Sequence, residues 1–465
     1  MILYEAFNNV AKQFPNNHAL FCNGLFLTYA QTLDKIEQYS QLLNNASNSE
    51  KNALFIYCKK SFHNILWQLT ANKLGHVFVN ADINTPIDRV AYMLEVTSPQ
   101  WIITDNGVDI ANLGYHPVLN IDNIFLWSKI NKDNKLLTLE NQCKGVLTHI
   151  YFSSGSTGKP KAILLNDQPI IGVVKQQAKQ ISLTATSKFA WLLSPSFDAS
   201  LSDIYTTLLS GGCLYICNFK MSQIKTLRAY FKDHGITHSD LSPSILPLLE
   251  PKHFPDLKAI IFGGEVANEK VIHSWLHSGI HMYNAYGPTE ATICSSLKTV
   301  DCQWTANNIG QPLNDVFYHM MPIEAENKIQ HELYISGSYL ALGYDQEILT
   351  NNKFITNNNM RYYKTGDLVS KNEKGDYLFM GRVDRQFKYN GILISPEEIE
   401  NYCFQSGCLE VLCKLEDKIT VYYSGNVSTQ YLKQQLLLKL PSSMIPQKWI
   451  KKEALTKNIN GKVQL

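Results

Sequence analysis

Short runs of β-branched and aromatic residues alternate with longer amphipathic stretches along the first part of the chain. The apolar runs ALFIYC, HVFVNA and WIITD occupy 53–58, 76–81 and 101–105, and the stretches 60–74 and 87–96 between them have helical spacing of apolar residues. A strand that is buried on both faces reads as a continuous apolar run. The alternation therefore predicts α/β units with parallel strands.

A second series of the same kind follows in the middle of the chain. Strands are predicted by FAWLLSP at 189–195, CLYICN at 213–218 and LKAIIFGGE at 257–265, and helices by the amphipathic stretches 200–210 and 222–234. We therefore expect two α/β halves of similar construction to lie side by side.

The pattern changes after about residue 315, where shorter strands alternate with Gly and Asn turns, as in ELYISGSYLALGY, YYKTGDLV and GDYLFMGR. These segments predict a β-rich subdomain that closes the large domain. The remainder, about 385–465, mixes strand and helix patterns and predicts a small α+β domain.

Composition excludes several classes of protein. The 465 residues include 42 Lys and Arg against 40 Asp and Glu, and no stretch concentrates basic residues as a nucleic-acid footprint would. No segment approaches the roughly 18 consecutive apolar residues of a membrane span, and the N-terminus lacks a signal-peptide pattern. The ten cysteines form no CxxC pair and are expected to be reduced. We expect a cytoplasmic protein that binds neither nucleic acid nor membrane.

The segment YFSSGSTGKPKA at 151–162 is the first candidate for chemistry. A Walker loop needs four residues between its glycines and then Lys-Ser or Lys-Thr before a helix. Here two residues separate Gly155 from Gly158, Lys159 is followed by Pro160, and KAILL reads as a strand. A strand, a Gly/Ser/Thr loop and a second strand could wrap phosphates with N–H groups and hydroxyls, and a bland polar hairpin is the alternative.

Further motifs follow this loop in a fixed order: SFDASLSDIY (196–205), NAYGPTEATIC (284–294), ELYISGSYLALGY (332–344), YKTGDLV (363–369), GRVDRQFKYNGILISPEEIE (381–400), LPSSMIP (440–446) and NINGKVQL (458–465). The set resembles the adenylate-forming superfamily of acyl-CoA synthetases, firefly luciferase and nonribosomal peptide synthetase adenylation domains. Among these, stand-alone amino-acid adenylation enzymes of the D-alanine–carrier protein ligase type are the most similar in architecture.

The resemblance implies a division of the chain and a reaction. An N-terminal adenylation core would span 1–380, a hinge 381–384, and a small mobile C-terminal domain 385–465. Mg²⁺ and ATP would activate a carboxylate as its adenylate, with release of pyrophosphate. The phosphopantetheine thiol of a carrier protein, expected to act in trans, would then take the acyl group.

The resemblance also implies roles for residues in the ATP site. The opening loop would cover the β- and γ-phosphates, Tyr286 would stack on adenine, Asp367 would bind the ribose hydroxyls, and Glu290 would ligate Mg²⁺. Without the family, Asp367 would be read as an Asx-turn residue. The implied ATP-binding set is Ser153, Ser154, Gly155, Ser156, Thr157, Gly158, Lys159, Gly264, Glu265, Asn284, Ala285, Tyr286, Gly287, Pro288, Thr289, Asp367, Phe379, Arg382 and Lys462.

Three residues of the C-terminal part resemble the moving parts of the family. Lys462 would bridge the substrate carboxylate and the nucleotide, and with Thr157 and Glu290 it completes the implied catalytic set. Asp384 would be the hinge, and Lys388 would face the active site only after the small domain rotates. Read without the family, Lys462 is a frayed surface charge near the end of the chain.

The implied substrate pocket consists of Asp198, Ala199, Ser202, Asp240, Ile261, Gly263, Ala285, Ile293, Cys294 and Lys462. Asp198 would pair with the α-ammonium group of an amino acid, although an Asp before SLSDIY is also typical of a helix N-cap. Asp240 adds a second carboxylate, which favours a large amino acid with a cationic or hydrogen-bond-donating end. Gly263 disfavours alanine, because D-alanine ligases carry a larger side chain there.

Two other functions remain open on the sequence. An acyl- or aryl-CoA ligase would share the ATP motifs but would leave Asp198 without its cation. A non-catalytic nucleotide-binding homologue is disfavoured because Thr157, Glu290, Asp367 and Lys462 are all present.

Overall fold

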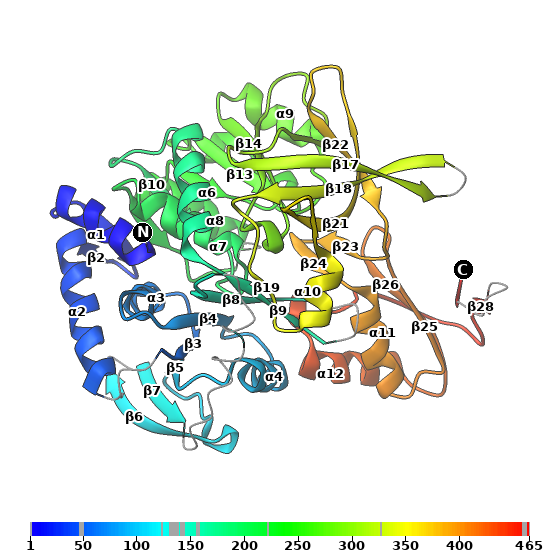
Figure 1. Cartoon of the computed structure of the whole chain (residues 1–465), viewed down its shortest axis with the longest axis horizontal. Coiled ribbons are helices and arrows are strands. Elements are labelled where there is room, and N and C mark those ends of the chain that lie inside the picture. The colour runs from blue at the N-terminus through cyan, green and yellow to red at the C-terminus, as the bar shows by residue number, and fades with distance from the viewer. Residues whose placement is uncertain are drawn as a thin grey trace.

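A computed structural model describes residues 2–45, 51–121, 124–129, 139, 145–154, 159–220, 223–325, 328–457 and 463–464. The large domain contains two mixed sheets with parallel cores and a third, antiparallel sheet, and the C-terminal segment forms a smaller body beside them (Figure 1). The predicted α/β class with a β-rich part is therefore confirmed. Within the described ranges, no helix is long and apolar enough to cross a bilayer.

The first sheet has the strand order β19-β9-β8-β4-β3-β5-β7-β6. Its parallel centre joins β3 to β4 and β5, and β3 is buried along its whole length, as its unbroken apolar sequence predicts. The strands are β3 (Ala53–Cys58), β4 (Val77–Asp82), β5 (Trp101–Asp105), β6 (Tyr115–Ile121), β7 (Ile124–Lys129), β8 (His149–Ser153), β9 (Lys161–Leu165) and β19 (Gly343–Tyr344).

The second sheet has the order β15-β14-β13-β12-β10-β11-β1-β2, and β14, β13, β12, β10, β11 and β1 run parallel. Its strands are β1 (His18–Cys22), β2 (Leu25–Thr28), β10 (Lys188–Trp191), β11 (Cys213–Ile216), β12 (His238–Asp240), β13 (Ala259–Gly263), β14 (His281–Tyr286) and β15 (Ser296–Thr299). Apolar side chains of both sheets join one buried cluster, so the two predicted halves share a core.

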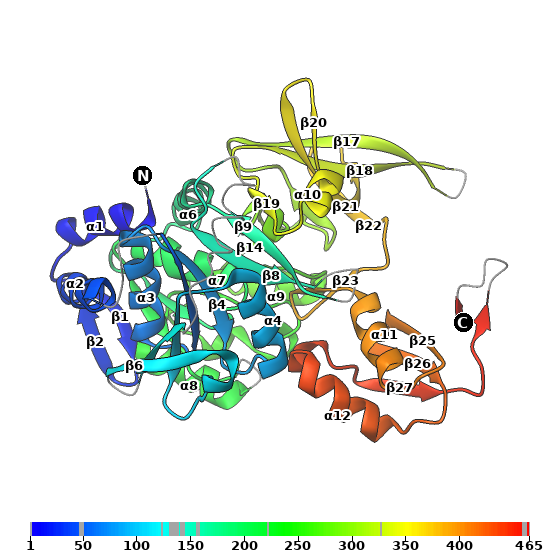
Figure 2. The same cartoon turned by 60° about the horizontal axis from the view of Figure 1, so that its bottom comes forward.

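Helices connect and cover these strands (Figure 2). They are α1 (Leu3–Gln13), α2 (Tyr29–Asn45), α3 (Phe62–Lys73), α4 (Ile87–Thr97), α6 (Asp167–Gln180), α7 (Ala199–Leu201), α8 (Ile224–His234) and α9 (Glu269–His277). The helix predicted over 200–210 differs from expectation: α7 continues into a π-helical segment, Ser202–Thr206, that packs against α6. The π-helical segment has only five residues, about one turn, so the apolar pattern cannot reveal its different period.

The antiparallel sheet has the order β16-β22-β21-β18-β17, and β20 pairs with β21. Its strands are β16 (Asn308–Gly310), β17 (Val316–Ala325), β18 (Lys328–Gly337), β20 (Phe354–Asn357), β21 (Met360–Lys371) and β22 (Tyr377–Arg382), with α10 (Glu347–Lys353) beside them. This is the β-rich part predicted after residue 315, although it begins with β16, several residues earlier.

The C-terminal body has its own core. It contains β23 (Phe387–Tyr389), β24 (Ile392–Ile394), α11 (Pro396–Gln405), β25 (Glu410–Leu415), β26 (Ile419–Ser424), α12 (Thr429–Lys439), β27 (Lys448–Lys451), β28 (Thr456–Lys457) and β29 (Val463–Gln464). Its buried cluster is built from α11, α12 and the β25-β26-β27 sheet. A separate core is what the predicted small domain over 385–465 requires.

The small-domain core supplies a prediction with an adjacent control. Leu436 on α12 is fully buried, whereas Leu437 is 52% exposed. Leu436→Ala should destabilise the small domain by about 2–5 kcal/mol, because it removes apolar contacts and leaves a cavity, and Leu437→Ala should change it by less than about 0.5 kcal/mol. Hydrogen exchange of small-domain amides measures both. Equal loss of protection in the two variants would contradict this packing.

Candidate functional site

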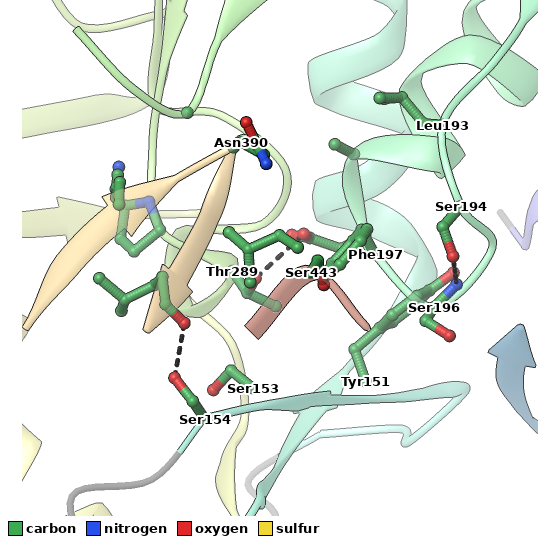
Figure 3. Close-up of a pocket in the computed structure, with 18 of the residues that line it drawn as sticks. Tyr151, Ser153, Ser154, Leu193, Ser194, Ser196, Phe197, Thr289, Asn390 and Ser443 are labelled. Carbon is green, nitrogen blue, oxygen red and sulfur yellow. Dashed lines mark hydrogen bonds between the residues drawn. The ribbon is translucent and has the colours of Figure 1, made fainter. Parts of the chain in front are cut away.

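A cavity of about 1030 Å³ lies where the carboxyl ends of the parallel strands of both sheets meet. The ends of β8, β10, β12, β13 and β14 and the start of β9 supply the wall on the large-domain side. The β23–β24 hairpin and the loop at 441–444 of the small domain supply the opposite wall. Figure 3 shows Tyr151, Phe197 and Thr289 from the first wall and Asn390 and Ser443 from the second.

Asp198 is buried at one end of this cavity and is held by neutral donors. The hydroxyl of Thr289 donates to Oδ1 at 3.0 Å (Figure 3), and the backbone N–H of Ile293 donates to Oδ2 at 3.1 Å. Burial raises the pKa of Asp198 to about 6, although both hydrogen bonds lower it. No Lys, Arg or His side chain forms an ion pair with Asp198 among the described residues, although the charge of Asp198 acts on nearby Lys388. A cationic ligand group would further stabilise the ionised form of Asp198.

The backbone that supports Asp198 is strained. Thr292 and Ile293 have φ values of 53° and 65°, which β-branched residues rarely adopt. This conformation aims the Ile293 N–H at Asp198. Backbone strain of this kind typically accumulates at binding sites.

The implied side-chain pocket lies beside Asp198. Asp240 lines the cavity at the end of β12, and no hydrogen bond or ion pair reaches its carboxylate within the described part of the chain. Burial raises the pKa of Asp240 to about 7. Ser202 donates to Oε1 of Gln177 at 2.8 Å, so its hydroxyl is already engaged. The cavity also includes Ala199, Ile261, Gly263, Ala285, Ile293 and Cys294.

Gly263 has a structural reason to lack a side chain. A Cβ built on Gly263 would lie 2.2 Å from the carbonyl oxygen of Ala285 on β14. The close approach of β13 and β14 therefore excludes any larger residue on this backbone. Gly263 is therefore weaker evidence against alanine as the substrate than the sequence suggested.

Glu290, the residue after Thr289, forms a buried ionic cluster in the same cavity. Nζ of Lys161 lies 2.7 Å from its Oε1, and the hydroxyl of Tyr344 donates to the same oxygen at 2.6 Å. Burial alone would raise the pKa of Glu290, but Lys161 and Tyr344 lower it to about 2. The carboxylate is thus ionised at neutral pH, as a ligand for a hard divalent cation must be.

Asp367 and Arg382 form a second ion pair at the cavity. The hydroxyl of Tyr286 also donates to Asp367, at 2.5 Å, and Nε of Arg382 lies 2.7 Å from Oδ1 of Asp384. Lys388 of the small domain places its ammonium 5.3 Å from the centre of the Tyr286 ring. Burial lowers the pKa of Lys388, and the carboxylate of Asp367 opposes this. The implied hinge residue and the implied second lysine both line the cavity.

The other residues that the resemblance assigns to the nucleotide differ in whether they line the cavity. Ser153, Ser154, Gly264, Gly287, Pro288 and Thr289 line the cavity, and the hydroxyl of Ser154 donates to the Leu393 carbonyl at 2.5 Å. Gly155, Ser156, Thr157, Gly158 and Lys462 lie outside the described residues.

Five implied residues do not line the cavity. Tyr286 is buried beside it, and its hydroxyl donates to Asp367. Asn284 donates to the Asn308 carbonyl, the Phe379 N–H donates to the Asn307 carbonyl, and Glu265 accepts from the Asn390 N–H at 2.7 Å. Lys159 is exposed, with its ammonium 5.5 Å from the centre of the Tyr92 ring.

Two cations of the site were missed by the sequence reasoning. Lys161 begins β9 and faces Glu290, and Lys353, the last residue of α10, also lines the cavity. Burial, together with the positive charge of Lys161, lowers the pKa of Lys353. Lys161 could have been recognised as the one charged residue of the otherwise apolar strand KAILL. No local pattern indicates Lys353.

Comparison with known proteins agrees with this site. The model of the AMP-binding enzyme family matches residues 7–345, so the chain belongs to that family. The resemblance to adenylate-forming enzymes of the nonribosomal peptide synthetase type is therefore confirmed, and with it the use of ATP.

Two curated relatives show the extent of the similarity. A linear gramicidin synthase of Brevibacillus parabrevis is 28% identical over 488 residues, which cover 100% of this chain and 6% of that protein. Tyrocidine synthase 1 of the same organism is 26% identical over 485 residues, which cover 99% of this chain and 44% of that protein. The chain thus spans less than half the length of each of these relatives.

Solved structures share the fold. An artificially fused adenylation–PCP di-domain, NpsA-ThdA of Klebsiella oxytoca, superposes with a TM-score of 0.80 at 21% identity, covering 97% of this chain and 93% of that one. The o-succinylbenzoate CoA synthetase of Bacillus subtilis gives 0.81 at 17%, covering 100% and 97%. At these identities the likeness concerns the fold alone.

The Lys161–Glu290 pair yields a prediction. Lys161→Met leaves Glu290 buried without its cation, which should destabilise the large domain by about 3–5 kcal/mol. Lys159→Met, two residues away on the exposed side of the hairpin, should change stability by less than about 0.5 kcal/mol. Thermal unfolding of the two variants checks this, and a similar melting temperature for both would argue against the pair.

Proposed function

We propose that this enzyme activates an α-amino acid with ATP, forming aminoacyl-AMP and pyrophosphate, and then transfers the aminoacyl group to the phosphopantetheine thiol of a carrier protein. The observation that carries the proposal is Asp198, a buried carboxylate held by one hydroxyl and one backbone N–H. An α-ammonium group would supply the missing positive charge. Fatty and aryl acids without an amine would leave that carboxylate unpaired.

The second carboxylate of the pocket favours a cationic side chain. Asp240 has no described partner, and Asp203 lies fully buried on the π-helical segment. Burial raises the pKa of Asp203 and the nearby charge of Asp240 raises it further, whereas the positive charge of Lys60 lowers it. Two buried carboxylates close together attract a proton or a cation. A Lys- or Arg-like end, or another strong donor, would supply it.

The nucleotide would occupy the cation-rich end of the cavity. Asp367, which would bind the ribose, lines the cavity and accepts a hydrogen bond from Tyr286, the proposed neighbour of adenine. Lys161, Lys353 and Arg382 would add positive charge for the phosphates. Glu290 fits Mg²⁺, because its second oxygen is free of the Lys161 and Tyr344 contacts. No cluster of three metal-ligating side chains occurs within the described ranges, so phosphates and water would complete the shell. The metal would offset charge on the phosphates.

The reaction would proceed in two balanced steps. In the first, a substrate carboxylate oxygen attacks the α-phosphorus, and the bond to the β-phosphate oxygen breaks. In the second, the thiol sulfur attacks the acyl carbon, AMP leaves through its phosphate oxygen, and the thiol loses its proton. Lys462 would hold the carboxylate in the first step, and the Lys388 side of the small domain would face the cavity in the second.

The arrangement in this structure suits the second step. Lys388 lines the cavity, whereas β28 and β29, which flank Lys462 in sequence, lie on the outer side of the small domain (Figures 1 and 2). Adenylation would therefore require rotation about the segment 381–384, where Asp384 lies.

An acyl- or aryl-CoA ligase is the second candidate, and the likeness to a CoA synthetase fold supports it. Such an enzyme would use the same ATP end of the cavity. Its substrate would not need a positive charge to pair with Asp198. Comparing activity with carboxylic acids that have or lack an α-amine therefore distinguishes the two functions.

The proposed roles of Asp198 and Asp240 can be tested by comparing a set of carboxylic acids as substrates. ATP–pyrophosphate exchange should be fastest with Arg, Lys or another donor-ended amino acid and negligible with their des-amino analogues. Asp240→Asn should lower kcat/KM for the cationic substrate by roughly 10- to 100-fold, the effect of one charge-assisted hydrogen bond. The value for norleucine, whose side chain lacks the terminal ammonium group of Lys, should be nearly unchanged. Exchange that is equal or faster with acids lacking the amine would reject the role of Asp198.

A pH profile tests the ionisation of the pocket. Asp198 must be ionised to bind an α-ammonium group, and its raised pKa of about 6 means that this form is lost as the pH falls through 6. We expect kcat/KM for the amino acid to fall nearly tenfold per pH unit below that point. The preference for Lys over norleucine should decline earlier, near the pKa of about 7 at Asp240. A profile that is flat from pH 8 to 5 would contradict both expectations.

A further inference from the structure

The small domain contacts the large domain at a second place, away from the hairpin that enters the cavity. Nη1 of Arg89 on α4 lies 2.7 Å from Oε1 of Glu398 on α11, although 309 residues separate them. The two side chains are only 8% and 0% exposed. This is a buried ion pair between domains.

Glu398 depends on Arg89 because the other atoms around its carboxylate provide little compensation for its charge. The second oxygen of Glu398 is buried and accepts no hydrogen bond from the described residues. Tyr402 on α11 and Asp88 and Lys439 at the α4–α12 contact are the neighbouring titratable groups. A buried carboxylate with one partner depends strongly on that partner.

A second, exposed pair joins the two domains beside it. Nζ of Lys439 on α12 lies 2.7 Å from Oδ2 of Asp88 on α4, with side-chain exposures of 43% and 49%. An exposed pair of this kind contributes little. It therefore serves as a natural control for the buried pair one residue away on α4.

The buried pair is connected to Lys388 by a short stretch of the small domain. α11 begins at Pro396, directly after β24, so a fixed α11 fixes the β23–β24 hairpin that carries Lys388 over the Tyr286 ring. The hairpin has its own contacts to the large domain at Ser154 and Glu265. Rotation of the small domain would break all of these contacts together.

We propose that Arg89 and Glu398 form an interdomain latch that holds the small domain in the orientation with Lys388 in the cavity. The inference rests on the proposed two-step function, in which this orientation serves thiol transfer. Arg89 and Glu398 are thus positioning residues for the second step, and the latch must open before each round of adenylation. Loss of the latch shifts the population of orientations without altering the amino-acid pocket.

The main experiment separates the two half-reactions. Glu398→Gln keeps the shape of the side chain and removes its charge. With the amino acid that gives the fastest exchange, ATP–pyrophosphate exchange should stay within about twofold of wild type, and formation of the aminoacyl thioester of free pantetheine should fall about tenfold or more. Lys439→Gln, the exposed control, should leave both rates within about twofold.

A charge swap tests the pair itself. Arg89→Glu combined with Glu398→Arg restores opposite charges in the same place, and thioester formation should recover at least partly relative to Glu398→Gln. Equal thioester rates in Glu398→Gln and wild type would overturn the latch. So would a parallel loss of both half-reactions in Glu398→Gln, because that result indicates general damage.

A distance measurement tests the latch without relying on turnover. Nitroxide labels at Val118→Cys in the large domain and Leu409→Cys in the small domain, both exposed positions, report domain orientation in a background with Cys302→Ser. Glu398→Gln should add a second distance population, and Lys439→Gln should not. An unchanged distribution rejects the latch, whereas wild-type protein inactive with every amino acid rejects the proposed function and leaves this measurement valid.

Discussion

The cavity between the two domains gathers carboxylates that have left water, and each must be balanced by positive charge or hydrogen bonds. Glu290 has Lys161, and Asp367 has Arg382. Asp198 has only neutral donors, and Asp240 has no described partner. Because an isolated buried charge is costly, a ligand that brings positive charge to these two carboxylates would stabilise their ionised forms.

The same constraint explains why the site lies between domains. The strands of the large domain can place acidic groups at their carboxyl ends, but they leave the cavity open on one side. The small domain closes it and adds the ammonium group of Lys388. If the small domain rotates as proposed, it would exclude water when closed and admit substrates when open. The buried Arg89–Glu398 pair adds an interdomain contact at the edge of the cavity, which Arg89 also lines.

The sequence predicted the parallel strands well, because fully buried strands such as β3 and β13 carry unbroken apolar runs. Ordered motifs also predicted Asp198, Glu290 and Asp367, and the resemblance to the family's substrate pocket predicted Asp240; all four line the cavity. The sequence did not predict that Lys161, and not Lys159, faces the cavity, because the direction of each side chain depends on the register of β8 with β9. The Gly263–Ala285 approach and the Arg89–Glu398 pair depend on tertiary packing, which no local pattern encodes.

The distribution of charge along the cavity orders its ligands. Lys161, Lys353 and Arg382 lie close to Glu290 and Asp367, and the charges of Glu290, Asp367 and Asp198 all act on Lys388. Asp198 and Asp240 line the same cavity. An amino acid with a cationic side chain would place its two positive groups at Asp198 and Asp240, and its carboxylate would then point toward the cations. Thr289 marks the boundary, because it binds Asp198 and precedes Glu290. A triphosphate drawn to the cation-rich end would meet the substrate carboxylate at this boundary, which is where an acyl–phosphate bond has to form.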